Sequence, residues 1–409
     1  MTGRIVIAGA GVAGATAART LRTEGYTGEI VVFGTEAHLP YRRPMVSKEL
    51  LAGTANERRL LLESADSWTT LDVELRCATA VTGIDVDGDR VHVADGSALG
   101  YDALVLATGA RARQLPGPEQ GAFVLRGAAD VEPLRTAMLD GGSILIIGGG
   151  LVGCEVAATA RGLGVQVEVV HSGSGPLARV VAPVVGEHCR KLHADNGVDI
   201  HDAVALERVD NVGSGIRAVA VDGREWRAAA ALIAIGSEPD TALAQQAGLA
   251  VGDGILVDEY HTTSAPNIFA AGDAAAVYDA ELGIHLRTEQ WNSARAHGIA
   301  VANAVLGREI PRAEVNWGWT TQYGTTIQFA GRPDPDDEIV VRTGDAPERF
   351  VVLSVRAGRL TAAAAVARPA DLRAARSLIA ARTVHDRETW TDPAVTLADL
   401  AAAEPIARH

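Results

Sequence analysis

Two glycine-rich segments of one type most constrain the fold of this chain. Each follows a short apolar run, at 5–8 and at 144–147, and precedes a stretch of small residues. A Gly-x-Gly-x-x-Gly segment between a buried strand and a helix binds a pyrophosphate, because the glycines allow a tight turn and close backbone approach, while the helix N-terminus attracts negative charge. We therefore expect two dinucleotide sites. The glycines of the two segments are Gly9, Gly11 and Gly14, and Gly148, Gly150 and Gly153.

The bulk properties exclude several classes of protein. A net charge of −14 argues against a nucleic-acid partner, which requires an excess of Lys and Arg. The apolar runs are far shorter than the ~20 residues of a membrane-spanning helix, and we expect a cytoplasmic protein. The three cysteines are scattered, so the spacing predicts neither a disulfide framework nor a metal site. They are Cys77, Cys154 and Cys189.

Strand and helix signals alternate along most of the chain, which predicts an α/β fold. We expect strands at 4–8, 29–34, 103–107, 143–147, 165–170 and 232–235, and antiparallel strands with one helix after residue 317. The predicted architecture is two Rossmann-like dinucleotide-binding domains, similar to glutathione reductase, and a small α+β C-terminal domain. The first domain is formed by 1–110 and 240–316, the second by 111–239, and the third by 317–409.

Two acidic residues have the positions expected of flavin ligands. Asp273 ends the stretch 263–273, which closes with Ala-Gly-Asp, and its carboxylate can accept a hydrogen bond from a ribityl hydroxyl. Glu36 lies 22 residues after Gly14, where an acid can hold the hydroxyls of the adenosine ribose. The alternatives are a helix N-cap for Asp273 and a solvated loop acid for Glu36.

Taken together, these motifs resemble the pyridine nucleotide–disulfide oxidoreductase superfamily. Within it, the segment 39–48 is similar to the Pro-Tyr-x-Arg-Pro-x-Leu-Ser-Lys signature of bacterial ferredoxin reductases that serve Rieske dioxygenases and haem-thiolate monooxygenases. Putidaredoxin, rhodocoxin and biphenyl-dioxygenase ferredoxin reductases belong to this branch. Gly153-Cys154-Glu155 and the segments 287–294 and 317–323 agree with it, so the resemblance runs from residue 4 to about 400.

The resemblance implies roles for individual residues. Lys48 would lie near the reactive N5 edge of FAD and pair with Glu155, and with Trp319 at the flavin edge these form the expected catalytic set. Arg43 would bind a flavin phosphate, Arg126 being a weaker candidate. The further FAD ligands expected are Gly9, Gly11, Val12, Ala13, Gly14, Glu36, Val81, Ala107, Thr108, Gly109, Asp273, Gln290 and Trp291. Those for NAD(P)H are Gly148, Gly150, Leu151, Val152, Gly153, Glu155, His171 and Gly236.

Simpler explanations exist for some of these residues. Lys48 could be a surface lysine, Arg126 a charge at the rim, and either tryptophan part of the core. The strand expected at 165–170 is followed by His171, where NADH-using relatives have a glutamate that repels a 2′-phosphate. The sequence therefore leaves NADH and NADPH both open, with NADH favoured.

The cysteines decide between branches of the superfamily. Disulfide reductases carry a cysteine pair near the flavin, but residues 40–48 contain no cysteine. The resemblance thus implies hydride transfer from NAD(P)H to N5 of FAD, followed by transfer of single electrons to a two-iron ferredoxin. The alternatives are a flavin oxidoreductase acting on a quinone or oxygen, and a redox-responsive interaction protein. We expect a monomer or a dimer.

Overall fold

The computed structural model describes residues 3–116, 120–213, 215–312 and 314–403. The chain divides into two compact units, each described here by itself. Unit 1 contains Met1–Pro44, Ala55–Arg111 and Ser237–Glu314, and unit 2 contains Met45–Thr54, Ala112–Gly236 and Val315–His409. Three short elements lie at boundaries between the two units along the chain: η1 (Arg43–Met45), β8 (Ala110–Ala112) and β17 (Ser237–Pro239).

Unit 1 is built on a parallel sheet with the strand order β20-β7-β1-β2-β3. Unit 1 also contains an antiparallel ribbon, β4-β5-β6, and a mixed four-stranded sheet, β18-β19-β21-β22, in which β19 and β21 are parallel. The bounds are β1 (Arg4–Ala8), β2 (Glu29–Phe33), β3 (Glu74–Arg76), β4 (Val81–Asp85), β5 (Arg90–Val93), β6 (Ala98–Gly100), β7 (Ala103–Leu106), β18 (Val251–Gly252), β19 (Gly254–Val257), β20 (Ile268–Ala270), β21 (Ala275–Asp279) and β22 (Ile284–Arg287). Its helices are α1 (Val12–Thr23), α2 (Glu57–Leu60), α3 (Ala65–Thr70), α7 (Ala242–Gln246), η4 (Gly272–Ala274) and α8 (Trp291–Val305).

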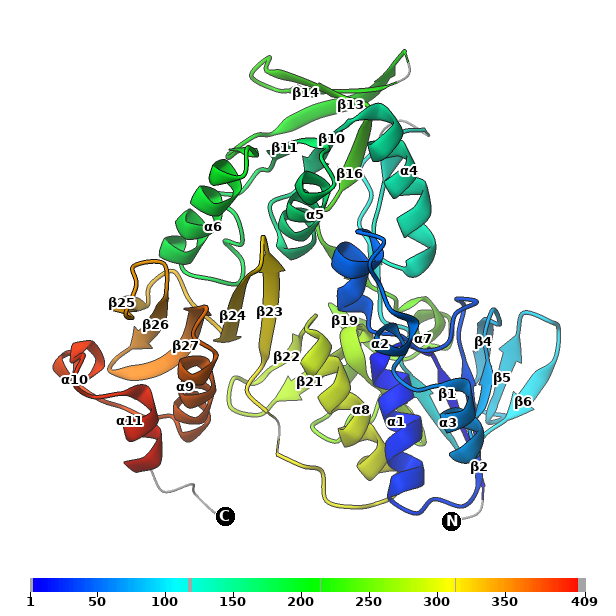
Figure 1. Ribbon diagram of the computed structural model, residues 1–409. Helices are drawn as coiled ribbons and strands as arrows, with labels where there is room; N and C mark the ends of the chain where they lie inside the picture. The colour runs from blue at the N-terminus through cyan, green and yellow to red at the C-terminus, as the bar shows by residue number, and fades with distance from the viewer. Residues whose placement is uncertain (1–2, 117–119, 214, 313, 404–409) are drawn as a thin grey trace. The chain divides into compact units, whose positions relative to one another are not determined.

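After their first residues, the central strands of unit 1 are apolar because both faces of the sheet are buried there. In β1, Ile5 and Ile7 pack on one face with α1 and α8, whereas Val6 and Ala8 pack on the other. Figure 1 shows α1 and α8 side by side. This packing fixes the N-terminus of α1 at the carboxyl edge of β1.

Unit 2 contains a second parallel sheet, with the order β12-β11-β10-β16-β9, and an antiparallel ribbon β13-β14-β15. The strands are β9 (Ala122–Phe123), β10 (Ser143–Ile147), β11 (Gln166–Val170), β12 (Asp199–His201), β13 (Leu206–Val212), β14 (Gly215–Ala220), β15 (Glu225–Ala228) and β16 (Ala230–Ile233). The helices of this part are η2 (Val46–Leu50), η3 (Ala128–Asp130), α4 (Val131–Gly141), α5 (Leu151–Gly162) and α6 (Pro183–Asp195).

The C-terminal part of unit 2 is an antiparallel sheet, β23-β24-β27-β26-β25, with α9 packed on it and α11 packed against α9. Phe350 and Val352 of β26 join a core that also contains residues of α5 and α6, while Val351 and Leu353 face α9. The nucleotide-type part and the C-terminal sheet therefore share apolar packing. The bounds are β23 (Trp317–Gln322), β24 (Thr325–Gly331), β25 (Glu338–Thr343), β26 (Phe350–Arg356), β27 (Arg359–Val366), α9 (Pro369–Ala381), α10 (Arg387–Thr391) and α11 (Leu397–Ala403).

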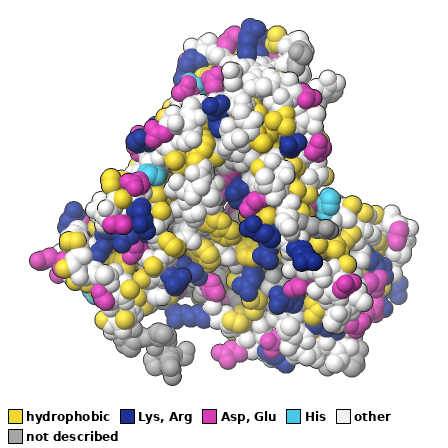
Figure 2. Space-filling view, in the orientation of Figure 1, with side chains coloured by type: hydrophobic (Ala, Val, Ile, Leu, Met, Phe, Trp, Pro, Cys, Tyr) yellow, Lys and Arg dark blue, Asp and Glu magenta, His cyan; other side chains and the backbone are white. Residues whose placement is uncertain are grey.

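The predicted α/β fold with two dinucleotide-type sheets is confirmed. One strand differs in position: β16 begins at Ala230, earlier than the expected 232–235, because parallel pairing with β10 includes two alanines of low intrinsic strand preference. No helix in the described ranges has the length and apolarity to cross a bilayer. Figure 2 shows basic and acidic side chains interspersed on the visible face. The three-domain division stays a prediction.

Candidate functional site

The first glycine segment leaves room for a ligand at one position. A Cβ at Gly9, whose φ is +122°, would lie 2.0 Å from the carbonyl oxygen of Ala107, and one at Gly14 would lie 2.0 Å from that of Gly9. These two glycines are therefore required by the protein's own packing. A Cβ at Gly11 would meet no atom within 4 Å. The space in front of Gly11, at the N-terminus of α1, fits the pyrophosphate of FAD.

Glu36 forms a hydrogen-bonded triad with two residues of the Pro-Tyr-x-Arg segment. Its carboxylate accepts a 2.6 Å bond from Tyr41 Oη and a 2.6 Å bond from Arg43 Nη2, and Arg43 Nη1 donates to Tyr41 Oη. Burial would raise the pKa of Glu36, but the Arg43 guanidinium and these hydrogen bonds outweigh it and hold the pKa below its ordinary value. The carboxylate is thus ionised and oriented, as an acid that binds ribose hydroxyls must be.

The other expected FAD ligands of unit 1 lie mainly where strands end. β7 and β20 are parallel neighbours, so Thr108 and Asp273 follow at the same edge of the sheet. Burial lowers the pKa of Arg43, but the interactions with Tyr41 and Glu36, and to a smaller extent with Asp273, outweigh burial and raise this pKa. Gln290 precedes α8, and its Oε1 is buried without a hydrogen-bond partner among the described residues. The remaining positions are Val12 and Ala13 in the first turn of α1, Val81 at the start of β4, Ala107 and Gly109 after β7, and Trp291 at the start of α8.

A histidine pair, with His261 buried and His297 half-buried, supports the segment that carries Asp273. The rings of His261 and His297 lie 4.8 Å apart, and His261 Nδ1 bonds the carbonyl oxygen of Ala270. Burial, and next the charge of His261, lowers the pKa of His297 to about 3, although a hydrogen bond with the Gly272 backbone opposes this. Burial also lowers the pKa of His261. Both rings are therefore neutral in the folded protein at neutral pH.

We expect this pair to make unit 1 sensitive to acid. The unfolded chain protonates a histidine near pH 6.5, whereas folded His297 resists protonation down to about pH 3. The unfolded state thus binds more protons below pH 6.5, and the free energy of unfolding falls as the pH falls. His297 alone accounts for a loss of about 2 kcal/mol between pH 6.5 and 5.

Urea unfolding at pH 7.5 and 5.0 checks this expectation. His297→Gln should flatten the pH dependence, and FAD should be released at pH 5 sooner from the parent protein than from this variant. His92→Gln is the control, because His92 is exposed on β5 of the same unit. Equal slopes for the parent and His297→Gln would contradict the assignment.

The second glycine segment repeats the geometry of the first in unit 2. A Cβ at Gly148 or Gly153 would lie within 2.2 Å of a backbone oxygen, whereas one at Gly150 would meet nothing within 4 Å. The open position precedes α5, so the same reasoning fits the pyrophosphate of a second dinucleotide. The first turn of α5 contains Leu151 and Val152, and Val152 is exposed.

Lys48 and Glu155 form an ion pair inside unit 2. Lys48 Nζ lies 2.8 Å from Glu155 Oε2, and the two side chains are only 17% and 7% exposed. Ser47 Oγ also donates to this carboxylate, and the Ser47 carbonyl accepts a 2.8 Å bond from Thr159 of α5. Lys48 belongs to η2, a π-helical turn, a rare form that often occurs at functional sites. The pair is thus held by both η2 and α5.

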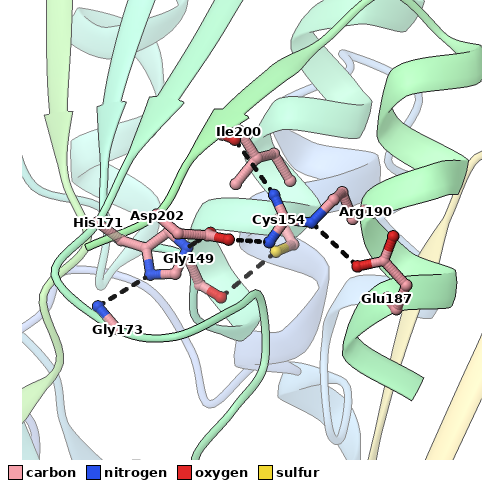
Figure 3. Close-up of polar contacts among 8 residues, drawn as sticks. All are labelled: Gly149, Cys154, His171, Gly173, Glu187, Arg190, Ile200 and Asp202. Carbon is pink, nitrogen blue, oxygen red and sulfur yellow. Dashed lines mark hydrogen bonds and ion pairs between the residues drawn. The ribbon is translucent and has the colours of Figure 1, made fainter. Parts of the chain in front are cut away.

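His171 is engaged on both ring nitrogens (Figure 3). Nε2 lies 2.6 Å from Oδ1 of Asp202, and Nδ1 accepts a 3.2 Å bond from the Gly173 N–H. Arg190 donates to the other carboxylate oxygen of Asp202 and to the carbonyl of Ile200. The ring therefore has no free nitrogen to donate to a 2′-phosphate.

Asp202 was missed by the sequence analysis. It comes directly after β12, which runs parallel to β11, so its carboxylate lies at the same strand ends as His171. The sequence pattern that indicates Asp202 is an acidic residue directly after β12, the next strand along the chain, rather than directly after β11. Gly236, with φ of +108°, follows β16.

Two further residues expected to contact FAD belong to unit 2: Trp319, expected at the flavin edge, and Arg126, the weaker candidate for a flavin phosphate. Trp319 lies on β23, half-buried, with its ring 5.8 Å from that of Trp317. Arg126 precedes η3, and its N–H donates to Asp130. Their roles toward FAD stay predictions.

Two of the three cysteines, distant in sequence, lie together in unit 2. Cys154 of α5 and Cys189 of α6 are fully buried and form a cluster with His193. A hydrogen bond from Cys154, with smaller contributions from His193 and Gln322, lowers the pKa of Cys189 to about 6. The cysteine spacing does not indicate this cluster, because the two cysteines belong to different helices and lie far apart in the chain.

Known proteins resemble this chain over its whole length. Residues 3–298 match the family of pyridine nucleotide-disulphide oxidoreductases, and residues 317–401 match the reductase C-terminal family. The ferredoxin–NAD(+) reductase subunit of the benzene 1,2-dioxygenase system of Pseudomonas putida is 36% identical over 98% of both chains. The corresponding component of the biphenyl dioxygenase system of Paraburkholderia xenovorans (strain LB400) is 37% identical over 99% of this chain and 100% of its own.

A solved structure agrees with these relatives. The covalent putidaredoxin reductase–putidaredoxin complex matches with a TM-score of 0.92 and 31% identity, covering 98% of this chain and 99% of the other. The resemblance inferred from the two glycine segments and the segment 39–48 is thereby confirmed. The chain belongs to the pyridine nucleotide-disulphide oxidoreductase family and ends in a reductase C-terminal domain.

Proposed function

We propose that this protein is an NADH-dependent, FAD-containing ferredoxin reductase that supplies single electrons to a two-iron ferredoxin of an oxygenase system. The observation that carries the proposal is the similarity along the entire chain to ferredoxin–NAD(+) reductases of two dioxygenase systems. The two open glycine positions, Gly11 and Gly150, support it because each fits one pyrophosphate. A cytoplasmic location and a monomer or dimer belong to the same proposal.

The residues of the chain bind and orient rather than donate protons. FAD, when bound, accepts a hydride and releases its electrons one at a time. In unit 1, Gly11 would admit the pyrophosphate and Glu36 would hold the adenosine ribose. Asp273 would accept a hydrogen bond from a ribityl hydroxyl. In unit 2, Gly150 would admit the nicotinamide dinucleotide, and the Lys48 ammonium, oriented by Glu155, would supply the positive charge that stabilises developing negative charge.

The cysteines support a direct route for the electrons. Cys154 and Cys189 are fully buried, and Cys77 follows β3 without a second cysteine near it in the sequence. A thiol relay needs an accessible thiolate beside a partner thiol. We therefore assign the ferredoxin, rather than a disulfide, as the acceptor.

Anaerobic stopped-flow measurements test the function. NADH should bleach the bound flavin within the dead time or the first second, and cytochrome c should then be reduced only when a two-iron ferredoxin is present. Rapid quinone reduction with no response to any ferredoxin would support an oxidoreductase for small acceptors instead. Slow bleaching with a persistent long-wavelength band would support the redox-responsive interaction protein.

Asp202 leads us to expect a preference for NADH. Its carboxylate lies at the strand ends where an adenine ribose is bound in this fold, and it would repel a 2′-phosphate although Arg190 offsets part of its charge. We expect Asp202→Asn to raise the ratio of kcat/KM for NADPH to that for NADH by about tenfold, corresponding to about 1.4 kcal/mol.

Glu187→Gln provides the control for Asp202→Asn. Glu187 contacts the same arginine but is 71% exposed, so its removal should leave the cofactor ratio unchanged. An unchanged ratio in Asp202→Asn, with normal reduction by NADH, would show that another residue selects the cofactor.

A further inference from the structure

We propose that Cys154, Cys189 and His193 form a binding site for a thiophilic divalent cation, of which Zn²⁺ is the natural example. Each of the three residues offers one ligand atom, and these atoms all lie within 4.8 Å of one another. All three side chains are fully buried. The site lies within unit 2 and is separate from the residues assigned to either dinucleotide.

The helices bring the three ligands to one point. Cys189 and His193 are four residues apart on α6, so they share one face of that helix. Cys154 enters from α5, which packs in the same apolar core. Around a tetrahedral Zn²⁺ the sulfur atoms lie about 3.8 Å apart, given Zn–S bonds of about 2.3 Å. The distance between the two sulfur atoms would therefore need to shorten by about 1 Å or less for both to bind the cation.

The two ring nitrogens of His193 differ in their hydrogen bonding. Nδ1 lies 2.9 Å from Tyr323 Oη, an arrangement like the outer hydrogen bond that orients metal-bound histidines. Nε2 is buried and has no hydrogen-bond partner within the part of the chain that the structure describes. A buried nitrogen that lacks a partner costs free energy, and a cation bound to it would remove that cost.

The donor set selects the kind of cation. Two sulfurs and one imidazole favour Zn²⁺ over Mg²⁺ or Ca²⁺, which require oxygen ligands. Gln322 Oε1, which lies 3.1 Å from Cys189 Sγ, is an oxygen available near the fourth position. Because Gln322 ends β23, a bound cation would connect α5 and α6 with the C-terminal sheet.

The proposed site would also affect the second glycine segment. Cys154 Sγ lies 3.6 Å from the carbonyl oxygen of Gly149, and the Cys154 N–H donates to Gly150. Cys154 precedes Glu155, the partner of Lys48. A cation on the cysteine sulfur would therefore fix the first turns of α5, where the nicotinamide dinucleotide is proposed to bind.

Equilibrium dialysis against Zn²⁺ tests the proposal. The protein carries FAD, its thiols are kept reduced, and its metal content is measured by mass spectrometry. We expect about one Zn²⁺ per chain and a higher melting temperature with Zn²⁺ than with a chelator. Cobalt substitution gives a second readout, because tetrahedral Co²⁺ absorbs visible light at longer wavelengths than oxidised FAD does. These measurements do not depend on ferredoxin reduction, so they can fail while the proposed function stands.

Matched variants locate the bound metal. Cys189→Ser and His193→Gln should each weaken Zn²⁺ binding at least tenfold, whereas Cys77→Ser, at the third cysteine in unit 1, should bind as the parent does. Circular dichroism at 20 °C would establish that each variant is folded. The proposal would be overturned by a stoichiometry far below one Zn²⁺ per chain, or by Cys189→Ser binding Zn²⁺ as tightly as the parent. A protein mass showing a Cys154–Cys189 disulfide that persists in reductant would also overturn it.

Discussion

Replacing Lys48 with alanine is expected to lower the free energy of unfolding by about 3 kcal/mol, because it leaves the buried carboxylate of Glu155 without its counter-charge. The hydrogen bond from Ser47 remains and keeps the loss at the lower end of the range for broken buried pairs. Urea unfolding of the FAD-loaded protein measures the change. Reduction by NADH should also slow at least tenfold, as for removal of one charge that stabilises a transition state.

The chain provides a matched control for this substitution. Lys191, the one other lysine in the sequence, is paired with Asp195 on the surface of α6 and is 71% exposed. Lys191→Ala should change stability by less than about 1 kcal/mol. A Lys48→Met, Glu155→Gln double variant should regain most of the stability but not the reduction rate. If it regained both, the pair would be structural only.

Gly11→Val is expected to weaken FAD binding on the order of 100-fold, about 2.7 kcal/mol, while the apoprotein folds normally. The backbone at Gly11 has a negative φ, and its Cβ would meet no protein atom, so the fold tolerates a side chain there. The added methyl groups would instead occupy the space assigned to the pyrophosphate. Fluorescence titration of the apoprotein with FAD measures the affinity.

Two other glycines test this explanation. Gly162→Ala, at another open glycine, should leave FAD affinity unchanged. Gly14→Ala should fail differently, by destabilising the apoprotein, because its Cβ would lie 2.0 Å from the Gly9 oxygen. Normal FAD affinity in Gly11→Val would exclude the proposed position of the pyrophosphate.

The sequence was sufficient to predict the two parallel sheets, because apolar strands, glycine turns and small-residue helices are all local patterns. The pairing of Lys48 with Glu155 was expected only from the resemblance. Asp202 and the Cys154–Cys189 cluster could not be predicted, because each depends on which strand or helix is the neighbour in space. The position of β16 was also missed, because pairing with β10 overrides the weak strand preference of alanine.

The apolar core that α5 and α6 share with the C-terminal sheet limits how this chain can be divided. A protein ending before Val315 would expose part of the core that contains Cys154, Val185 and Cys189, because Phe329 and Phe350 belong to the same core. Such a fragment should aggregate rather than act as an autonomous NADH-binding module. Chimaeras between related reductases should consequently remain soluble only when residues 112–236 and 315–409 are inherited from the same parent.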